Sequence, residues 1–145
     1  MTRLHGPSHL TAGGAARRIV LPLLAACLTM GALLVASDIA GTRRVAAITA
    51  LATAVAVSLA LAGAVGDGRT RTTAIFGGLG FTLGVAIPGV LSYGILLVPA
   101  IVAWTIAAAA SERHGLSAPS RFVPALGGML GGLFAVLAVI AVLPR

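Results

Sequence analysis

The chain has no lysine, asparagine or glutamine, and only three acidic residues, Asp38, Asp67 and Glu112. Arginine therefore carries all of the strong basic charge, as the codons of a GC-rich genome would produce, and we expect a bacterial protein. Only 9% of the 145 residues are charged and 59% are hydrophobic, whereas a soluble domain has about 25% charged residues. The composition predicts an integral membrane protein that crosses the bilayer several times.

Cysteine is nearly absent as well, because Cys27 is the only one. An intrachain disulfide and a thiolate metal cluster are thereby excluded. The segment 24–27 has the shape of a lipobox, and Arg17-Arg18 before an apolar run resembles a twin-arginine leader. A cleaved leader should be followed by polar sequence, but Leu28–Ala36 stays apolar. We therefore expect neither signal, and lipidation of Cys27 stays open.

Charge is missing altogether from Thr72 to Ala110, 39 residues without Asp, Glu, His, Lys or Arg. One helix of that length would measure about 58 Å, whereas the hydrocarbon core of a bilayer is about 30 Å thick. The stretch is therefore predicted to cross twice and to turn between Pro88 and Gly94. The alternative is a single crossing in which one half dips into the membrane and returns.

These lengths predict an all-α bundle of five transmembrane spans, or of four spans with a re-entrant segment. Residues 1–18 are predicted to be a disordered cytoplasmic tail, and residues 19–143 a single transmembrane domain. Gly41 is the expected turn residue of the first loop, and Gly66-Asp67-Gly68 is a strong helix stop. The predicted spans are 19–37, 45–65, 73–88, 94–110 and 122–143.

The distribution of arginine predicts the orientation. With five spans and the N-terminus in the cytoplasm, seven arginines lie inside and three outside, whereas a single crossing of the long stretch gives six and four. The positive-inside rule therefore favours five spans. Arginines at the ends of apolar runs also suit anionic lipid headgroups, so we expect the bilayer and not a nucleic acid as their partner.

Ionisable side chains are absent from the predicted spans. Proton relays and ion pathways need such groups, so their absence argues against a proton-coupled pump and against catalysis inside the bilayer. Asp67, Glu112 and His114 in the loops are the only groups that could converge, and they lack the spacing of a metal site. We expect no enzymatic activity, no catalytic residue, no cofactor and no metal.

Polar residues inside the spans are mostly threonine and serine. Such hydroxyls usually bond to a carbonyl one turn earlier in their own helix or to a neighbouring helix, and a hydroxyl-lined path for a solute is the alternative. Trp104 fits an interfacial aromatic belt only loosely, because it lies well inside its span.

Small residues recur every fourth position in three spans. They let helix backbones approach closely, so that van der Waals contact holds helices together in lipid. We predict these residues as helix-packing positions: Ala50, Ala54 and Ser58 of a longer ladder in the second span, Gly80 and Gly84 in the third, and Gly127, Gly128, Gly131 and Gly132 in the fifth.

The expected function is therefore that of an accessory or assembly component acting through helix–helix contacts. Its expected partners are other membrane proteins or further copies of itself in a bacterial plasma membrane. A passive solute transporter or pore subunit is the alternative, and an enzyme is the third hypothesis. A pore would need the hydroxyls of several helices on one face, and in this sequence they are scattered.

Overall fold

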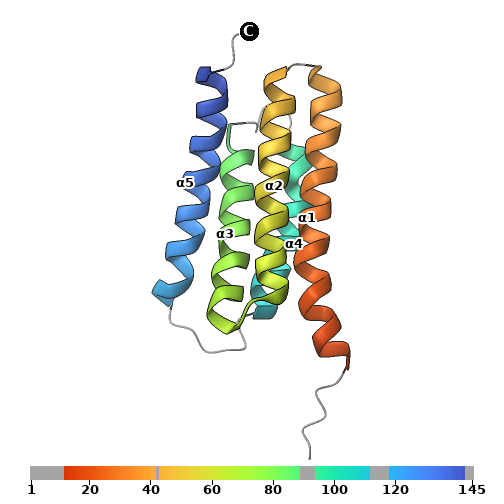
Figure 1. The fold of residues 1–145 in the computed structure, drawn as a ribbon, viewed down its shortest axis with the longest axis vertical. Helices are drawn as coiled ribbons and strands as arrows, with labels where there is room; N and C mark the ends of the chain where they lie inside the picture. The colour runs from red at the N-terminus through yellow and green to blue at the C-terminus, as the bar shows by residue number, and fades with distance from the viewer. Residues whose placement is uncertain (1–11, 42, 89–93, 112–117, 143–145) are drawn as a thin grey trace, which may run out of the picture.

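The computed structural model describes residues 12–41, 43–88, 94–111 and 118–142, and every element in these ranges is a helix (Figure 1). The elements are α1 (Ala12–Ala40), α2 (Arg43–Val65), α3 (Gly68–Ala86), the short 3₁₀ helix η1 (Gly94–Leu97), α4 (Val98–Ser111) and α5 (Ala118–Val142). The predicted all-α helical bundle is confirmed.

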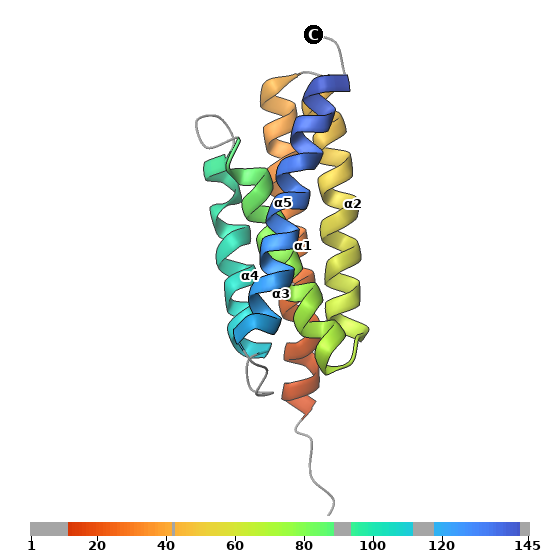
Figure 2. The same cartoon turned by 90° about the vertical axis from the view of Figure 1, so that its left-hand side faces the viewer.

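Successive helices run antiparallel, so that α1 begins at one end of the bundle and α5 finishes at the other (Figure 1). We call the end where α1 begins the proximal end, and the opposite end the distal end. Helices α1, α2, α3 and α4 form a ring in which each contacts its two neighbours. Helix α5 lies outside this ring, mainly against α3 and with a smaller contact to α2 (Figure 2).

Four segments are long and apolar enough to cross a membrane: 16–39, 45–65, 94–111 and 121–142. The chain is therefore a membrane protein with several membrane-spanning helices. Helix α3 is less apolar because it carries Arg69, Arg71 and many glycines and threonines. Its 19 residues correspond to about 28 Å, and the part without charge, Thr72–Ala86, corresponds to about 22 Å. Since α2, α4 and α5 pack around it, α3 needs few large apolar side chains toward lipid.

The turn signals of the sequence lie where the helices end. Gly41 has a φ of 61°, which glycine adopts without strain, and α2 and α3 are separated at Gly66-Asp67. The uncharged stretch 72–110 is divided between α3 and the η1–α4 segment, which run side by side in opposite directions (Figure 2). In both views α3 and α4 end short of the distal tips of α1, α2 and α5.

Two predicted boundaries need correction. Helix α1 begins at Ala12, so residues 12–18 are helical and do not belong to a disordered tail. This segment is rich in alanine, the strongest helix former, and a helix carries Arg17 and Arg18 beyond the apolar span into water. Helix α5 begins at Ala118 with a proline at its second position, where a missing N–H costs little, so the last connection is shorter than predicted. Residues 1–11 lie outside the described residues.

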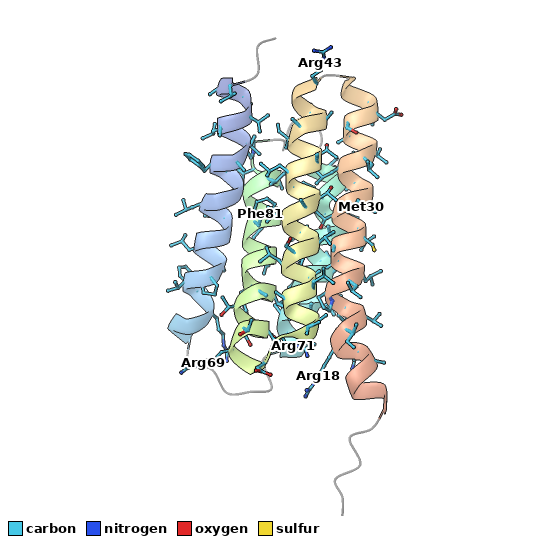
Figure 3. The ribbon with its side chains drawn as sticks, in the orientation of Figure 1. Arg18, Met30, Arg43, Arg69, Arg71 and Phe81 are labelled. Atoms are coloured by element: carbon cyan, nitrogen blue, oxygen red, sulfur yellow. The ribbon has the colours of Figure 1, made fainter. Side chains whose placement is uncertain are left out.

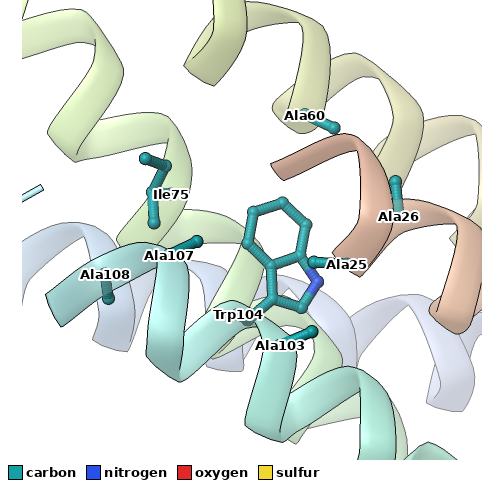
Figure 4. Packing of buried hydrophobic residues seen from close by; sticks show 8 residues of the cluster. All are labelled: Ala25, Ala26, Ala60, Ile75, Ala103, Trp104, Ala107 and Ala108. Carbon is teal, nitrogen blue, oxygen red and sulfur yellow. The ribbon is translucent and has the colours of Figure 1, made fainter. Parts of the chain in front are cut away.

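Trp104 forms the centre of the four-helix ring. Its side chain is fully buried among Ala25, Ala26, Ala60, Ile75, Ala103, Ala107 and Ala108 from all four helices (Figure 4). The indole of Trp104 also lies against Gly78, where a Cβ atom would be 2.5 Å from the indole. The indole N–H donates to the Thr29 hydroxyl at 3.4 Å, and that hydroxyl donates to the Ala25 carbonyl at 2.8 Å. Trp104 is therefore a core residue and not part of an interfacial belt.

Candidate functional site

The contact between α3 and α5 is made by glycines whose missing side chains admit the backbone of the other helix. A Cβ on Gly80 would overlap the Ala125 carbonyl oxygen, and one on Gly84 would overlap that of Met129. From the opposite side, a Cβ on Gly128 would overlap the Gly77 carbonyl oxygen. Carbonyl groups that face glycine Cα–H groups in this way add weak hydrogen bonds to the van der Waals contact.

Gly132 extends the same contact, because its Cβ would lie 2.5 Å from the Phe81 carbonyl oxygen. The structure thus brings four of the predicted packing residues, Gly80, Gly84, Gly128 and Gly132, into one interface. We call Gly128 and Gly132 the inner glycine strip of α5.

Gly127 and Gly131 each come one residue before a glycine of the inner strip and form a second strip on α5. We call this second strip the outer glycine strip. Apart from the neighbouring backbone of α5 itself, no atom of the described residues lies within 4 Å of a Cβ built on either glycine. The prediction that they pack against a facing helix is not met within this chain, because α5 is rotated so that only one of its two strips faces α3.

The outer strip forms one wall of an apolar groove of about 680 Å³ between α2 and α5. Helix α3 supplies its floor, with Ala74, Gly77 and Phe81. Val55 and Leu59 of α2 form the opposite wall, and Arg69, Thr70 and Thr73 lie at its proximal end. We call this the α2–α5 groove.

The small-residue ladder of α2 lies on the molecular surface. Ala46, Ala50, Ala54 and Ser58 are all exposed, so they do not pack against any of the described helices. Our expectation of packing is therefore unmet within the chain for Ala50, Ala54 and Ser58 too, because α2 turns Ala52, Ala56 and Ala60 inward instead. Ala46, Ala50 and Ala54 line a shallow groove of about 450 Å³ whose other wall includes Met30 and Leu34 of α1.

Thr53 also lines this second groove, which we call the α1–α2 groove. Among the described residues, its hydroxyl oxygen is the one buried side-chain polar atom without a hydrogen bond. Most other hydroxyls bond within their own helix: Thr72 donates to the Gly68 carbonyl and Thr82 to the Gly78 carbonyl, both at 2.9 Å. Thr49 instead crosses to α1, where it donates to the Leu33 carbonyl at 3.2 Å.

Positive charge gathers at the proximal end of the bundle. The Arg71 guanidinium donates to the Arg18 carbonyl at 2.9 Å, and both residues line a small polar cavity of about 210 Å³ with Asp67 and Ser111 (Figure 3). Arg71 lies in the first turn of α3, ahead of the predicted span. Its partial burial, followed by the charge of Arg18, lowers the pKa of Arg71.

The distal end carries Arg43, Arg44 and Asp38 at the α1–α2 turn.

Of the loop residues considered for an acid–base or metal site, the structure places only Asp67. Its carboxylate is exposed and does not cap α3. Glu112 and His114 lie outside the described residues. Within the described ranges, no three His, Cys, Asp or Glu side chains form a group that could hold a metal ion. Cys27 is exposed in the middle of α1.

The candidate functional surfaces are therefore the two grooves and the arginine-rich proximal end. Sequence reasoning found the glycines of the α3–α5 contact, but it missed Arg69, Thr70 and Thr73 as a group at the end of a groove. The sequence feature that could have indicated this group is that all three residues lie within about one turn at the start of the glycine-rich helix α3. No protein-family model, no curated protein and no solved structure matches the chain.

Proposed function

We propose that this protein is a non-catalytic accessory or assembly component of a bacterial plasma membrane. In this proposal the α1–α2 groove receives a transmembrane helix of another membrane protein or of a second copy of the chain. The N-terminus and the proximal end face the cytoplasm, as the positive-inside rule favours, because Arg17, Arg18, Arg69, Arg71 and Arg121 lie there.

The exposed ladder of α2 is the observation that carries this proposal. Inside the chain, small residues at every fourth position hold α5 against α3. Helix α2 presents the same spacing at Ala46, Ala50, Ala54 and Ser58, but none of the helices that the structure describes covers these residues. A surface of this kind lets a second backbone approach, which is how helices associate in lipid.

Thr53 gives independent support. A buried hydroxyl without a hydrogen bond is costly in hydrocarbon, where no water can replace the missing partner. Because Thr53 lines the α1–α2 groove, a side chain or carbonyl of an incoming helix would supply that partner after a rotation about its χ1 bond.

The hydroxyls favour this function over a solute pathway. Thr29, Thr72 and Thr82 donate to carbonyls of their own helices, so their hydrogen-bonding capacity is already used. Ser58 and Thr105, which are exposed, likewise donate to carbonyls one turn earlier at 2.8 Å. A path that replaces the hydration of a polar solute needs hydroxyls that are free and aligned on one face.

Site-specific photo-crosslinking in living cells tests the proposal. A photoreactive phenylalanine analogue replaces Ala54 in the α1–α2 groove or, as a control, Ala109, an exposed alanine of α4. We expect a discrete crosslinked product from position 54, of one partner or of a dimer, and none from position 109. Ala50→Leu in the same chain should abolish the product, because a leucine fills the groove.

The control for folding is the melting temperature of Ala50→Leu in detergent, which should equal that of the native chain because Ala50 is exposed. If positions 54 and 109 give the same diffuse products, or if Ala50→Leu leaves the product unchanged, the α1–α2 groove is not a docking surface for a helix.

A further inference from the structure

The α2–α5 groove is polar at one end and apolar along the rest of its length. Arg69, Thr70 and Thr73 are exposed at its proximal end, and Arg69 lies on the side of α3 that faces α5 (Figure 3). From Arg69 to Phe81 the groove follows α3 over 13 residues, or about 18 Å along the helix axis. Its polar end lies at the arginine-rich end of the bundle, where lipid headgroups would lie.

The outer glycine strip keeps this groove open. A glycine in a helix is less favourable than alanine, and the inner strip offsets this by its close contact with α3. Gly127 and Gly131 have no such contact with the described residues, because the space that a Cβ atom would enter is open at both positions. The absence of side chains at these two residues instead widens the groove. A ligand bound in the groove would make the contact with Gly127 and Gly131 that α3 makes with the inner strip.

The size of the groove suits an acyl chain. Its volume of about 680 Å³ lies within the range of about 300–1,000 Å³ for small-molecule sites. An acyl chain is thin enough to enter fully and to lie along Gly77 and Phe81.

We propose that the α2–α5 groove binds an anionic phospholipid, with an acyl chain between α2 and α5 and the phosphate beside Arg69. Thr70 and Thr73 can donate hydrogen bonds to the phosphate oxygens, and the Arg69 guanidinium supplies the positive charge. Charge complementarity selects an anionic headgroup, because among the described residues the proximal end carries five arginines and one acid, Asp67: the arginines are Arg17, Arg18, Arg69, Arg71 and Arg121. This lipid site lies on a different face from the α1–α2 groove and does not depend on the proposed function.

Melting of the full-length chain in detergent tests the proposal, with phosphatidylglycerol or phosphatidylcholine added at equal concentration. We expect phosphatidylglycerol to raise the melting temperature clearly more than phosphatidylcholine does. Arg69→Gln should lower the affinity for phosphatidylglycerol about fivefold, the usual effect of one basic side chain near an anionic surface. Gly131→Leu should remove the stabilisation by phosphatidylglycerol, because the leucine occupies the space of the acyl chain.

Each variant has a matched control. Arg43→Gln removes an exposed arginine at the distal end, and Gly31→Leu adds a leucine at an exposed glycine of α1 with equal open space. Both should keep the native preference for phosphatidylglycerol. The proposal is overturned if the two lipids stabilise the native chain equally, or if Arg69→Gln and Arg43→Gln respond alike. It is also overturned if Gly131→Leu changes the oligomeric state and leaves lipid binding unchanged.

Discussion

The two glycine strips of α5 have the same residue type and the same spacing, and they lie one position apart on one helix. Only the inner strip, Gly128 and Gly132, admits the backbone of α3, whereas the outer strip, Gly127 and Gly131, faces an open groove. The difference shows that a small-residue pattern marks where a close approach is possible and not where it occurs. The rotation of a helix about its own axis decides which strip is used.

The largest effect is expected where the backbones of α3 and α5 approach each other most closely. Gly80→Leu places a side chain where the Ala125 carbonyl lies, and this backbone cannot move without displacing α5. We expect a destabilisation of at least about 3 kcal/mol, the upper range for overpacking a core, or separation of α5 from the ring. Melting in detergent and protease access to α5 measure it.

Gly31→Leu is the control for that substitution, because it adds the same side chain to an exposed helical glycine with open space around it. Equal melting temperatures for the two variants would show that α3 and α5 do not meet through their backbones at Gly80.

A substitution in the outer strip is expected to raise the stability of the protein slightly instead of lowering it. Gly127→Ala adds a methyl group in open space and restricts the unfolded chain, so it should stabilise the protein by at most about 1 kcal/mol. The change is measured as a rise in melting temperature in lipid-free detergent. A clear fall would mean that Gly127 contacts another helix.

Chain-local features of the fold could be predicted from the sequence, because they depend on nearby residues. The break at Gly66-Asp67 and the turn at Gly41 follow from glycine chemistry, and the helix lengths follow from the thickness of a bilayer. The helical segment 12–18 was missed, since a polar composition was given more weight than its alanines.

Which face of each helix is buried could not be predicted in the same way. In a soluble helix the polar face marks the outside, but in lipid both the packed and the exposed positions are apolar. Ala54 and Ala56 of α2 differ in exposure although they are chemically identical. The position of Trp104 in the core was not predicted, for the same reason. The one sequence feature that indicated it is that a large indole ring needs small neighbours, and Trp104 lies in an alanine-rich helix.

A pair of alanine substitutions at adjacent residues, Gly131 and Gly132, tests the division of α5 into two strips. Both exchange glycine for alanine in the same turn, so helix propensity and the effect on the unfolded chain are matched. Gly132→Ala should lower the free energy of unfolding by about 1–3 kcal/mol, because its Cβ would lie 2.5 Å from the Phe81 carbonyl oxygen. Gly131→Ala should leave that free energy unchanged or raise it by at most about 1 kcal/mol, measured in the same detergent. Equal destabilisation by both substitutions, or a greater loss from Gly131→Ala, would contradict the assignment of the inner strip to α3.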